Sequence, residues 1–366
     1  MKVLLLADPS SVHTIKWANS LNEKGINLSV FGFSSYQKSA YNNEISTTSL
    51  NIKPHKIVRS NIYLHKSIYL ISIFHLRRIL KLFNPDIIHA HYASSYGFLG
   101  RIINFRPYFI SVWGSDVFEF PKRSSITKRV FKYSLNGADK IFSTSRIMAK
   151  ELSKYTSKKI EVIPFGIDLN IFKRLSNYGK SEETFVIGTV KALEEIYGIE
   201  YLIKAFKIIK DKYSRINVRL LIVGSGSQEM KLKELCKELH IEKNVEFTGK
   251  VSFEKLTAYY NRMDVAVFLS KSESFGVAVL EASACEVPVI VSNVGGLPEV
   301  VENNITGFIV EKENPVAASE AIEKLMLEPD LRNQMGTNGR KRVEKFYNWN
   351  DCVDQMINIY SDILNG

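Results

Sequence analysis

Two glutamates, Glu273 and Glu281, stand eight residues apart, with a Phe-Gly turn and a helix-forming run between them. A glycine where a loop becomes a helix lets backbone N–H groups approach an anion, and the positive end of the helix dipole favours negative charge there. The pattern therefore predicts a phosphate at the backbone of Gly276 and Val277. Apolar residues recur at spacings of three and four after Gly276, which predicts that one face of the helix is buried.

The two carboxylates predict different contacts with such a ligand. Glu281 lies about one turn beyond Val277, and an acidic side chain near a phosphate-binding helix start accepts hydrogen bonds from ribose hydroxyls in dinucleotide folds. Glu273 precedes the turn and would face the group beyond the phosphates. The alternative is an ordinary helix N-terminus, in which Glu273 complements the helix dipole and Glu281 is solvated.

Lys191 and Gly224 follow two predicted strands of the same half of the chain. The ammonium of Lys191 would reach the phosphate site and neutralise charge in a transition state. Gly224 begins a Gly-Ser-Gly turn at a strand's carboxyl end, where open α/β sheets bind ligands. The alternatives are a solvated loop lysine and a plain tight turn.

Histidines occupy two strand ends in the first half of the chain. His89 and His91 alternate along one predicted strand, so they either share a face or split between the core and a site, and this pair alone is not expected to chelate a metal. His13 follows the first strand, where it would touch a second substrate or lie on the surface. Trp113 and Asp116 follow another strand, and Asp116 would act at the site or cap the next helix.

Short apolar strands alternate with amphipathic helices twice along the chain, which predicts two doubly wound α/β domains. A Pro- and Gly-containing segment at 163–168 places their boundary near residue 170. We expect an N-terminal domain of residues 1–170, completed by a C-terminal helix at about 349–366, and a second domain of residues 171–348. Ligands bind at the carboxyl ends of such strands, so the two domains are expected to face each other across a cleft. The expected strands are 3–7, 28–33, 87–90, 109–112, 140–143 and 160–162, then 185–190, 218–223, 245–247, 265–269, 289–291 and 307–310.

The composition of the 366 residues is that of a globular protein, with 45% hydrophobic and 24% charged residues. Three widely spaced cysteines form no Cys-x-x-Cys pair for zinc or redox chemistry, which favours a reducing cytoplasm. The first apolar run is too short for a signal peptide, and no run is long enough for a transmembrane helix.

The positive charge is confined to the first half of the chain. Residues 1–170 carry 24 Lys and Arg against 10 Asp and Glu, whereas residues 171–366 carry 25 against 28. Two segments, 65–81 and 122–132, look like basic amphipathic helices, the alternative for each being a solvated helix face. Nucleic-acid motifs are absent, so the pattern favours an anionic membrane surface over nucleic acid as the partner.

The residues quoted above, taken together, resemble glycosyltransferase family 4, the retaining sugar-nucleotide-dependent enzymes with the two-domain GT-B architecture. The resemblance covers nearly the whole chain and is most specific over 185–310, where the Glu-x7-Glu segment is followed by Cys-Glu-Val-Pro-Val-Ile and Gly-Gly-Leu-Pro-Glu-Val-Val. It implies that Glu281 binds the nucleotide ribose and that Glu273 contacts the donor sugar. It also implies that the backbone of Phe275, Gly276 and Val277 meets the sugar and diphosphate, and that Val251 contacts the base.

The resemblance extends to two segments of the first domain, 89–92 and 111–117, which are similar to acceptor-domain motifs of polysaccharide-assembling members. Some relatives have a His at the place of Trp113, which makes His91 the candidate for polarising the sugar. Many relatives also have a second lysine five or six residues after the first, but here Ile196 and Tyr197 occupy those places. The loop after the first strand, 8–12, lacks the usual glycines.

The resemblance implies transfer of a hexose-type unit from a nucleotide diphosphate sugar, with UDP as the expected carrier, and with the anomeric configuration retained. Glu273, Lys191 and His91 are the expected catalytic residues. No cofactor is expected, and no metal, because no Asp-x-Asp occurs in the chain. We expect a lipid-linked or growing-glycan acceptor, and a cytoplasmic protein held peripherally at the inner face of the membrane. The alternatives are a sugar-nucleotide epimerase of the same architecture and a basic nucleic-acid-binding protein.

Overall fold

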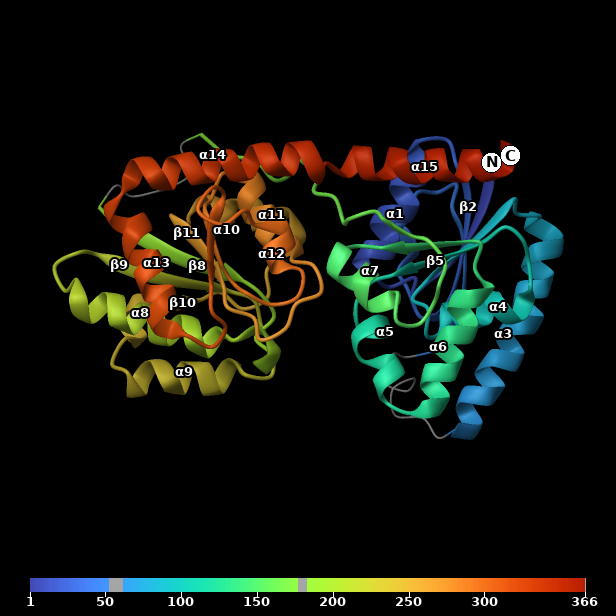
Figure 1. Cartoon of the computed structure of the whole chain (residues 1–366), viewed down its shortest axis with the longest axis horizontal. Helices are drawn as coiled ribbons and strands as arrows, with labels where there is room; N and C mark the ends of the chain where they lie inside the picture. Colours follow the sequence, from blue (N-terminus) through green and yellow to red (C-terminus); the bar gives the residue numbers. More distant parts are fainter. Residues whose placement is uncertain (53–61, 177–182, 366) are drawn as a thin grey trace. The chain divides into compact units, whose positions relative to one another are not determined.

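The computed structural model describes residues 1–52, 62–176 and 183–365 of the chain (Figure 1). The chain forms two compact units, one of Met1–Pro164 with Cys352–Gly366 and the other of Phe165–Asp351. The sequence placed these limits near residues 170 and 349. Each unit is a parallel sheet flanked by helices, which confirms the predicted α/β class.

The first unit has seven parallel strands in the order β3-β2-β1-β4-β5-β6-β7. The chain order reverses between β1 and β4, so the carboxyl ends of these two strands mark the position where open sheets bind ligands. The strands are β1 Lys2–Leu6, β2 Asn27–Ser34, β3 Ser46–Ile52, β4 Ile87–His91, β5 Tyr108–Val112, β6 Lys140–Ser143 and β7 Ile160–Val162. The helices are α1 Val12–Glu23, α3 Ile62–Phe83, α4 Tyr96–Ile103, α5 Ser115–Phe118, α6 Ser125–Gly137 and α7 Arg146–Leu152.

The second unit has six parallel strands in the order β10-β9-β8-β11-β12-β13, which reverses between β8 and β11. The strands are β8 Phe185–Val190, β9 Val218–Val223, β10 Val245–Phe247, β11 Val265–Phe268, β12 Val289–Ser292 and β13 Gly307–Val310. The helices are α8 Ile199–Lys212, α9 Glu229–Glu238, α10 Phe253–Asn261, α11 Val277–Ala284, α12 Leu297–Val300, α13 Pro315–Leu327 and α14 Pro329–Phe346. Every strand expected here from the sequence is present, within one residue at each end.

Helix α15, Trp349–Asn365, contributes its C-terminal part to the first unit. The ring of Tyr360 stacks on Phe109 of β5, with 5.8 Å between centroids. The Tyr360 hydroxyl is 2.6 Å from Nδ1 of His89 on β4, and Lys24 at the end of α1 pairs with Asp354. The helix therefore closes the core of a domain whose other elements lie some two hundred residues earlier in the chain.

None of the helices in the described ranges combines the length and the apolar composition needed to cross a bilayer. The inner strands of both sheets are buried almost throughout, as expected for parallel sheets that helices cover on both faces. The edge strands β3, β7 and β10 are half-exposed.

Candidate functional site

The turn that joins β11 to α11 depends on glycine at position 276. Gly276 has φ +109° and ψ 48°, a left-handed conformation that residues with a Cβ rarely adopt. A Cβ there would lie 2.9 Å from Cδ2 of Leu297. The residue precedes an eight-residue helix whose first backbone N–H groups have no partner within the helix. The sequence therefore places amide hydrogens and a positive helix end at this turn.

A diglycine on the neighbouring segment supports the same turn. The N–H of Gly296 donates to the carbonyl oxygen of Glu273 at 3.0 Å. A Cβ on Gly295 would lie 1.8 Å from that oxygen, and one on Gly296 would lie 2.6 Å from the carbonyl oxygen of Ser274. Backbone packs on backbone here, which only glycine permits. The diglycine is evident in the sequence, but its contact with the turn depends on tertiary packing.

Lys191 and Glu273 form an ion pair beside the turn. The ammonium of Lys191 lies 2.5 Å from Oε2 of Glu273, and the two side chains are 14% and 13% exposed. The same ammonium lies 4.4 Å from the centroid of the Tyr197 ring. The predicted alternatives of a solvated lysine and of a glutamate that only complements the helix dipole are therefore wrong. The cation and the first carboxylate predicted for the site are brought together across 82 residues of chain.

Glu281 is buried, and the hydroxyl of Tyr260 donates to its Oε2 at 2.8 Å. Burial raises the pKa of Tyr260 well above its ordinary value, and the nearby Glu281 carboxylate raises it further. Burial and the same carboxylate also raise the pKa of the Cys285 thiol. The alternative of a solvated Glu281 is wrong. The helix is buried on nearly every side, not on one face as predicted, because α14 packs on it through Gly339 at Ser283.

Gly224 and Val251 lie on the adjoining loops of the second unit. Gly224 has φ +139°, and a Cβ there would lie 1.9 Å from the carbonyl oxygen of Lys191. Its N–H donates to the carbonyl oxygen of Gly249 at 3.0 Å. The Gly-Ser-Gly turn is therefore fixed by backbone packing next to Lys191. Val251 is half-buried just before α10.

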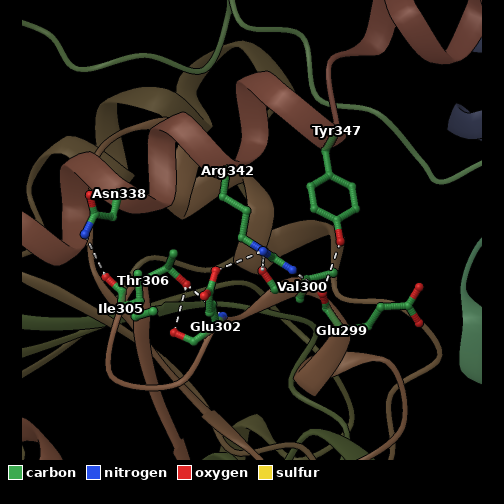
Figure 2. Close-up of polar contacts among 8 residues, drawn as sticks. All are labelled: Glu299, Val300, Glu302, Ile305, Thr306, Asn338, Arg342 and Tyr347. Carbon is green, nitrogen blue, oxygen red and sulfur yellow. Dashed lines mark hydrogen bonds and ion pairs between the residues drawn. The ribbon is translucent and has the colours of Figure 1, made fainter.

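Arg342 and Tyr347, two residues that the sequence analysis missed, hold the far end of α12 (Figure 2). The Arg342 guanidinium donates to the carbonyl oxygens of Glu299, at 3.0 Å, and Val300, at 3.2 Å. The Tyr347 hydroxyl donates to the same Glu299 oxygen at 3.1 Å, while its ring contacts Phe275 with 5.9 Å between centroids. Helix α14 and the residue after it thereby support both the diglycine segment and the turn. Neither Arg342 nor Tyr347 has a local sequence signal, because the carbonyl oxygens that they hold lie 42 to 48 residues earlier in the chain.

In the first unit, His91 lies at the end of β4 with its ring 4.4 Å from that of Trp113. His13 contacts the same indole edge-on at 5.8 Å, so two residues predicted for the acceptor side, His13 and Trp113, lie beside His91, which was predicted to be catalytic. The Nδ1 atom of His91 is buried and has no hydrogen-bond partner among the residues that the structure describes. Burial holds the pKa of His91 well below its ordinary value of 6.5, and His89 and His13 lower it further. His91 is therefore neutral at physiological pH.

Asp116 is buried, and its carboxylate accepts three backbone N–H groups, from Ala93 at 2.9 Å, Gly114 at 3.0 Å and Trp113 at 3.2 Å. Burial raises the pKa of Asp116, and these hydrogen bonds oppose the rise. The N-cap of α5 is Gly114, so the alternative in which Asp116 caps this helix is wrong. The side chain instead ties the loop after β4 to the loop after β5, which carries Trp113.

His89 is the core member of the histidine pair. One ring nitrogen is 2.6 Å from the Tyr360 hydroxyl and the other is 2.7 Å from the Ser111 hydroxyl. Burial lowers the pKa of His89 to about 3. The pair therefore divides its roles, since His89 is fully hydrogen-bonded inside the sheet while His91 keeps a nitrogen without a partner in the described structure.

This burial predicts acid sensitivity of the fold. His89 takes up a proton in the unfolded chain near pH 6.5 but in the folded chain only near pH 3. The contribution of neutral His89 to the free energy of unfolding is therefore fully present above pH 6.5. It is lost as the pH falls toward 3, by up to about 1.4 kcal/mol per pH unit. Urea unfolding at a series of pH values measures the slope, and a His89→Gln variant should show a shallower one. Equal slopes for the two proteins would contradict the assignment.

Comparison with known proteins identifies the family. The family described as glycosyl transferases group 1 matches residues 172–342, and the one described as glycosyl transferase 4-like matches residues 2–145. The chain belongs to the group 1 glycosyltransferases. The predicted GT-B fold is confirmed, since the fold of this glycosyltransferase matches those of solved structures over almost its entire length.

Two sequence relatives and one solved structure illustrate the similarity. An uncharacterized glycosyltransferase of Methanocaldococcus jannaschii is 27% identical over 93% of this chain and 91% of its own. The capsular polysaccharide biosynthesis glycosyltransferase CapM of Staphylococcus aureus is 37% identical over 60% of this chain and 59% of its own. HepE of Anabaena, solved with UDP, is 18% identical and has a TM-score of 0.80, covering 99% of this chain and 100% of that one.

Among residues 1–52, 62–176 and 183–365 of this glycosyltransferase, no three His, Cys, Asp or Glu side chains come together as they would to hold a metal ion. Tyr197 stands at one of the two places where the resemblance leads us to expect a second lysine, and its ring contacts the Lys191 ammonium. The Lys191 ammonium therefore contacts both an aromatic ring, that of Tyr197, and a carboxylate, that of Glu273.

Proposed function

We propose that this glycosyltransferase moves a sugar from a nucleotide diphosphate donor to a hydroxyl of a lipid-linked or growing glycan, with the anomeric configuration retained. The observation that carries the proposal is the left-handed Gly276 turn at the start of α11, with the Lys191–Glu273 pair beside it. Two of the similar proteins support the substrate classes: HepE has been solved with UDP and with UDP-glucose, and CapM is a capsular polysaccharide biosynthesis glycosyltransferase.

In the proposed donor complex, the backbone of Phe275, Gly276 and Val277 meets the diphosphate and sugar, next to the positive end of α11. Glu281 accepts hydrogen bonds from the ribose, held in position by Tyr260. Val251 contacts the base through its backbone, and Gly224 lets its loop pack closely on Lys191.

In the proposed reaction, the diphosphate leaves with charge that Lys191 and the α11 amides stabilise. Glu273 contacts the sugar, and its ion pair with Lys191 holds the carboxylate in its orientation. A retaining glycosidase uses a second carboxylate as nucleophile, but the pairing of Glu273 favours a binding role and attack from the face of the leaving group. Neutral His91 would polarise a sugar hydroxyl through Nδ1, with His13 and Trp113 beside it and Asp116 holding the Trp113 loop. We propose that the reaction needs no metal ion.

The donor assignment is tested at Glu281. Glu281→Ala should weaken the affinity for UDP-sugar about 10- to 100-fold, since a hydrogen bond to a charged group contributes about 1.5–3 kcal/mol. Isothermal titration calorimetry measures the affinity, and Tyr260→Phe is the matched control because it removes the Tyr260 hydrogen bond but keeps the carboxylate. Unchanged affinity in Glu281→Ala would refute the ribose assignment.

Acceptor dependence separates transfer from epimerisation of the sugar nucleotide. A transferase releases free nucleotide in proportion to the acceptor supplied, whereas an epimerase converts the donor alone. Neither relative named above is an epimerase, so we favour transfer.

We also propose that the protein works at the cytoplasmic face of the membrane, where nucleotide sugars and lipid-linked acceptors meet. Tight salt-sensitive binding of generic DNA without binding of any UDP-sugar would instead support the nucleic-acid alternative.

A further inference from the structure

The outward face of α3 combines exposed apolar side chains with basic ones. Leu70, Phe74 and Leu82 are 69%, 72% and 73% exposed, although the opposite face of the same helix buries Ile68 and Leu76 in the core. Arg77, Arg78 and Lys81 are exposed at positions that fall among the exposed apolar ones at 3.6 residues per turn. The face is also free of negative charge, because the chain has no Asp or Glu from residue 45 to residue 85.

Helix α6 continues this face. It exposes Ile126 and Tyr133 together with Lys128, Arg129 and Lys132, and no Asp or Glu occurs from residue 120 to residue 138. Figure 1 shows α3, α4 and α6 side by side. Aromatic rings connect them, with Tyr69 of α3 5.5 Å from Phe98 of α4, and Phe98 6.2 Å from Tyr133 of α6.

The exposed apolar and basic side chains of α3 and α6 named above form one surface, the α3–α6 face. Its composition indicates which class of partner it binds. A nucleic acid would pair with the basic side chains but would leave Leu70 and Phe74 in water. A second copy of the chain would bring two positive faces together, which costs free energy. An anionic bilayer satisfies both features, since apolar side chains enter the boundary between headgroups and acyl chains while Lys and Arg contact the headgroups.

We propose that the α3–α6 face docks the protein on anionic phospholipid, with Leu70 and Phe74 inserted at the interface and the basic residues of α3 and α6 on the headgroups. The inference rests on the proposed function, because docking would hold the enzyme beside a lipid-linked acceptor. The two predicted basic amphipathic segments, 65–81 and 122–132, lie in α3 and, from residue 125 on, in α6. The docking face joins them in one surface and requires apolar insertion as well as charge.

The test is flotation of the full-length protein with vesicles of phosphatidylcholine alone or with one third phosphatidylglycerol. Each basic residue near an anionic surface strengthens binding roughly fivefold, so Arg77→Gln/Arg78→Gln/Lys81→Gln should weaken binding to the anionic vesicles about a hundredfold. Leu70→Ser/Phe74→Ser should weaken it at least tenfold and should abolish the blue shift of a fluorophore placed at residue 71. The matched controls lie on the second unit: Lys231→Gln/Lys237→Gln/Lys341→Gln removes the same charge, and Met230→Ser alters a side chain that is 76% exposed.

Loss of binding in the two α3 variants but not in the controls supports the docking face. Equal losses in the α3 and control triple variants would reduce it to non-specific charge attraction, and an unaltered protein indifferent to phosphatidylglycerol would overturn it. Titration with UDP-sugar separates this inference from the proposed function, because every one of these variants should keep the donor affinity of the unaltered protein. A protein that floats with vesicles but binds no UDP-sugar would refute the proposed function and leave the docking face standing.

Discussion

Replacing Lys191 by Met is expected to lower kcat about 100- to 1000-fold, because the variant loses the one side-chain cation that we place against charge developing on the leaving diphosphate. No second lysine is available five or six residues later, where Ile196 and Tyr197 stand. The loss should fall mainly on kcat and less on KM, since the cation acts most strongly when charge develops. Steady-state kinetics with a UDP-sugar and acceptor measure both constants.

Lys271→Met is the matched control for this substitution. Lys271 follows β11, pairs with Glu200 at 3.0 Å and lies 5.6 Å from the ring of Tyr201, so its surroundings resemble those of Lys191. It has no role in the proposed reaction and its loss should change kcat less than about threefold, as expected for a surface ion pair. Equal kinetics for the two variants would show that Lys191 contributes only its ion pair with Glu273.

Gly276→Val is expected to abolish measurable donor binding. A side chain at φ +109° is strained by about 1–3 kcal/mol, and its Cβ would meet Leu297 at 2.9 Å and Val300 at 3.4 Å. The turn must therefore move, and with it the amides that we assign to the diphosphate. Calorimetric titration of a UDP-sugar should show at least a hundredfold loss of affinity.

Gly25→Ala controls for strain alone. Gly25 has φ +86° in the first unit, and a Cβ there would meet nothing within 4 Å. The variant should lose about 1 kcal/mol of stability and keep its donor affinity. If Gly276→Val melted no earlier than Gly25→Ala and bound the donor normally, the turn would have no part in binding.

The strands could be predicted because each is a short apolar run bounded by turn residues. In an α/β protein such a run is typical of a buried strand. The exception is β3, Ser46–Ile52, which the sequence analysis missed. Its Ser- and Thr-rich sequence is half-exposed at the edge of the sheet, so it lacks the apolar signal of a central strand. For helix α11 the sequence predicted too little burial. Its apolar pattern marks one buried face and cannot reveal that α14 covers the other side.

The site was predictable where a residue type is tied to one local geometry, and not where the contact is distant in sequence. Gly276 follows from the need for a left-handed residue at the helix start. The pairing of Gly296 with Glu273 and of Tyr360 with His89 depends on tertiary packing, the latter across 271 residues. Arg342 and Tyr347 were missed for the same reason, since neither has a local sequence signal for the carbonyl oxygens that it holds.

Amide hydrogen exchange with and without saturating UDP tests most directly whether the Gly276 turn binds the diphosphate. We predict slower exchange in the peptide that covers residues 273–280, and no such slowing in Gly276→Val at the same UDP concentration. UDP that binds and slows exchange elsewhere, while the 273–280 amides exchange as in the free protein, would contradict the assignment.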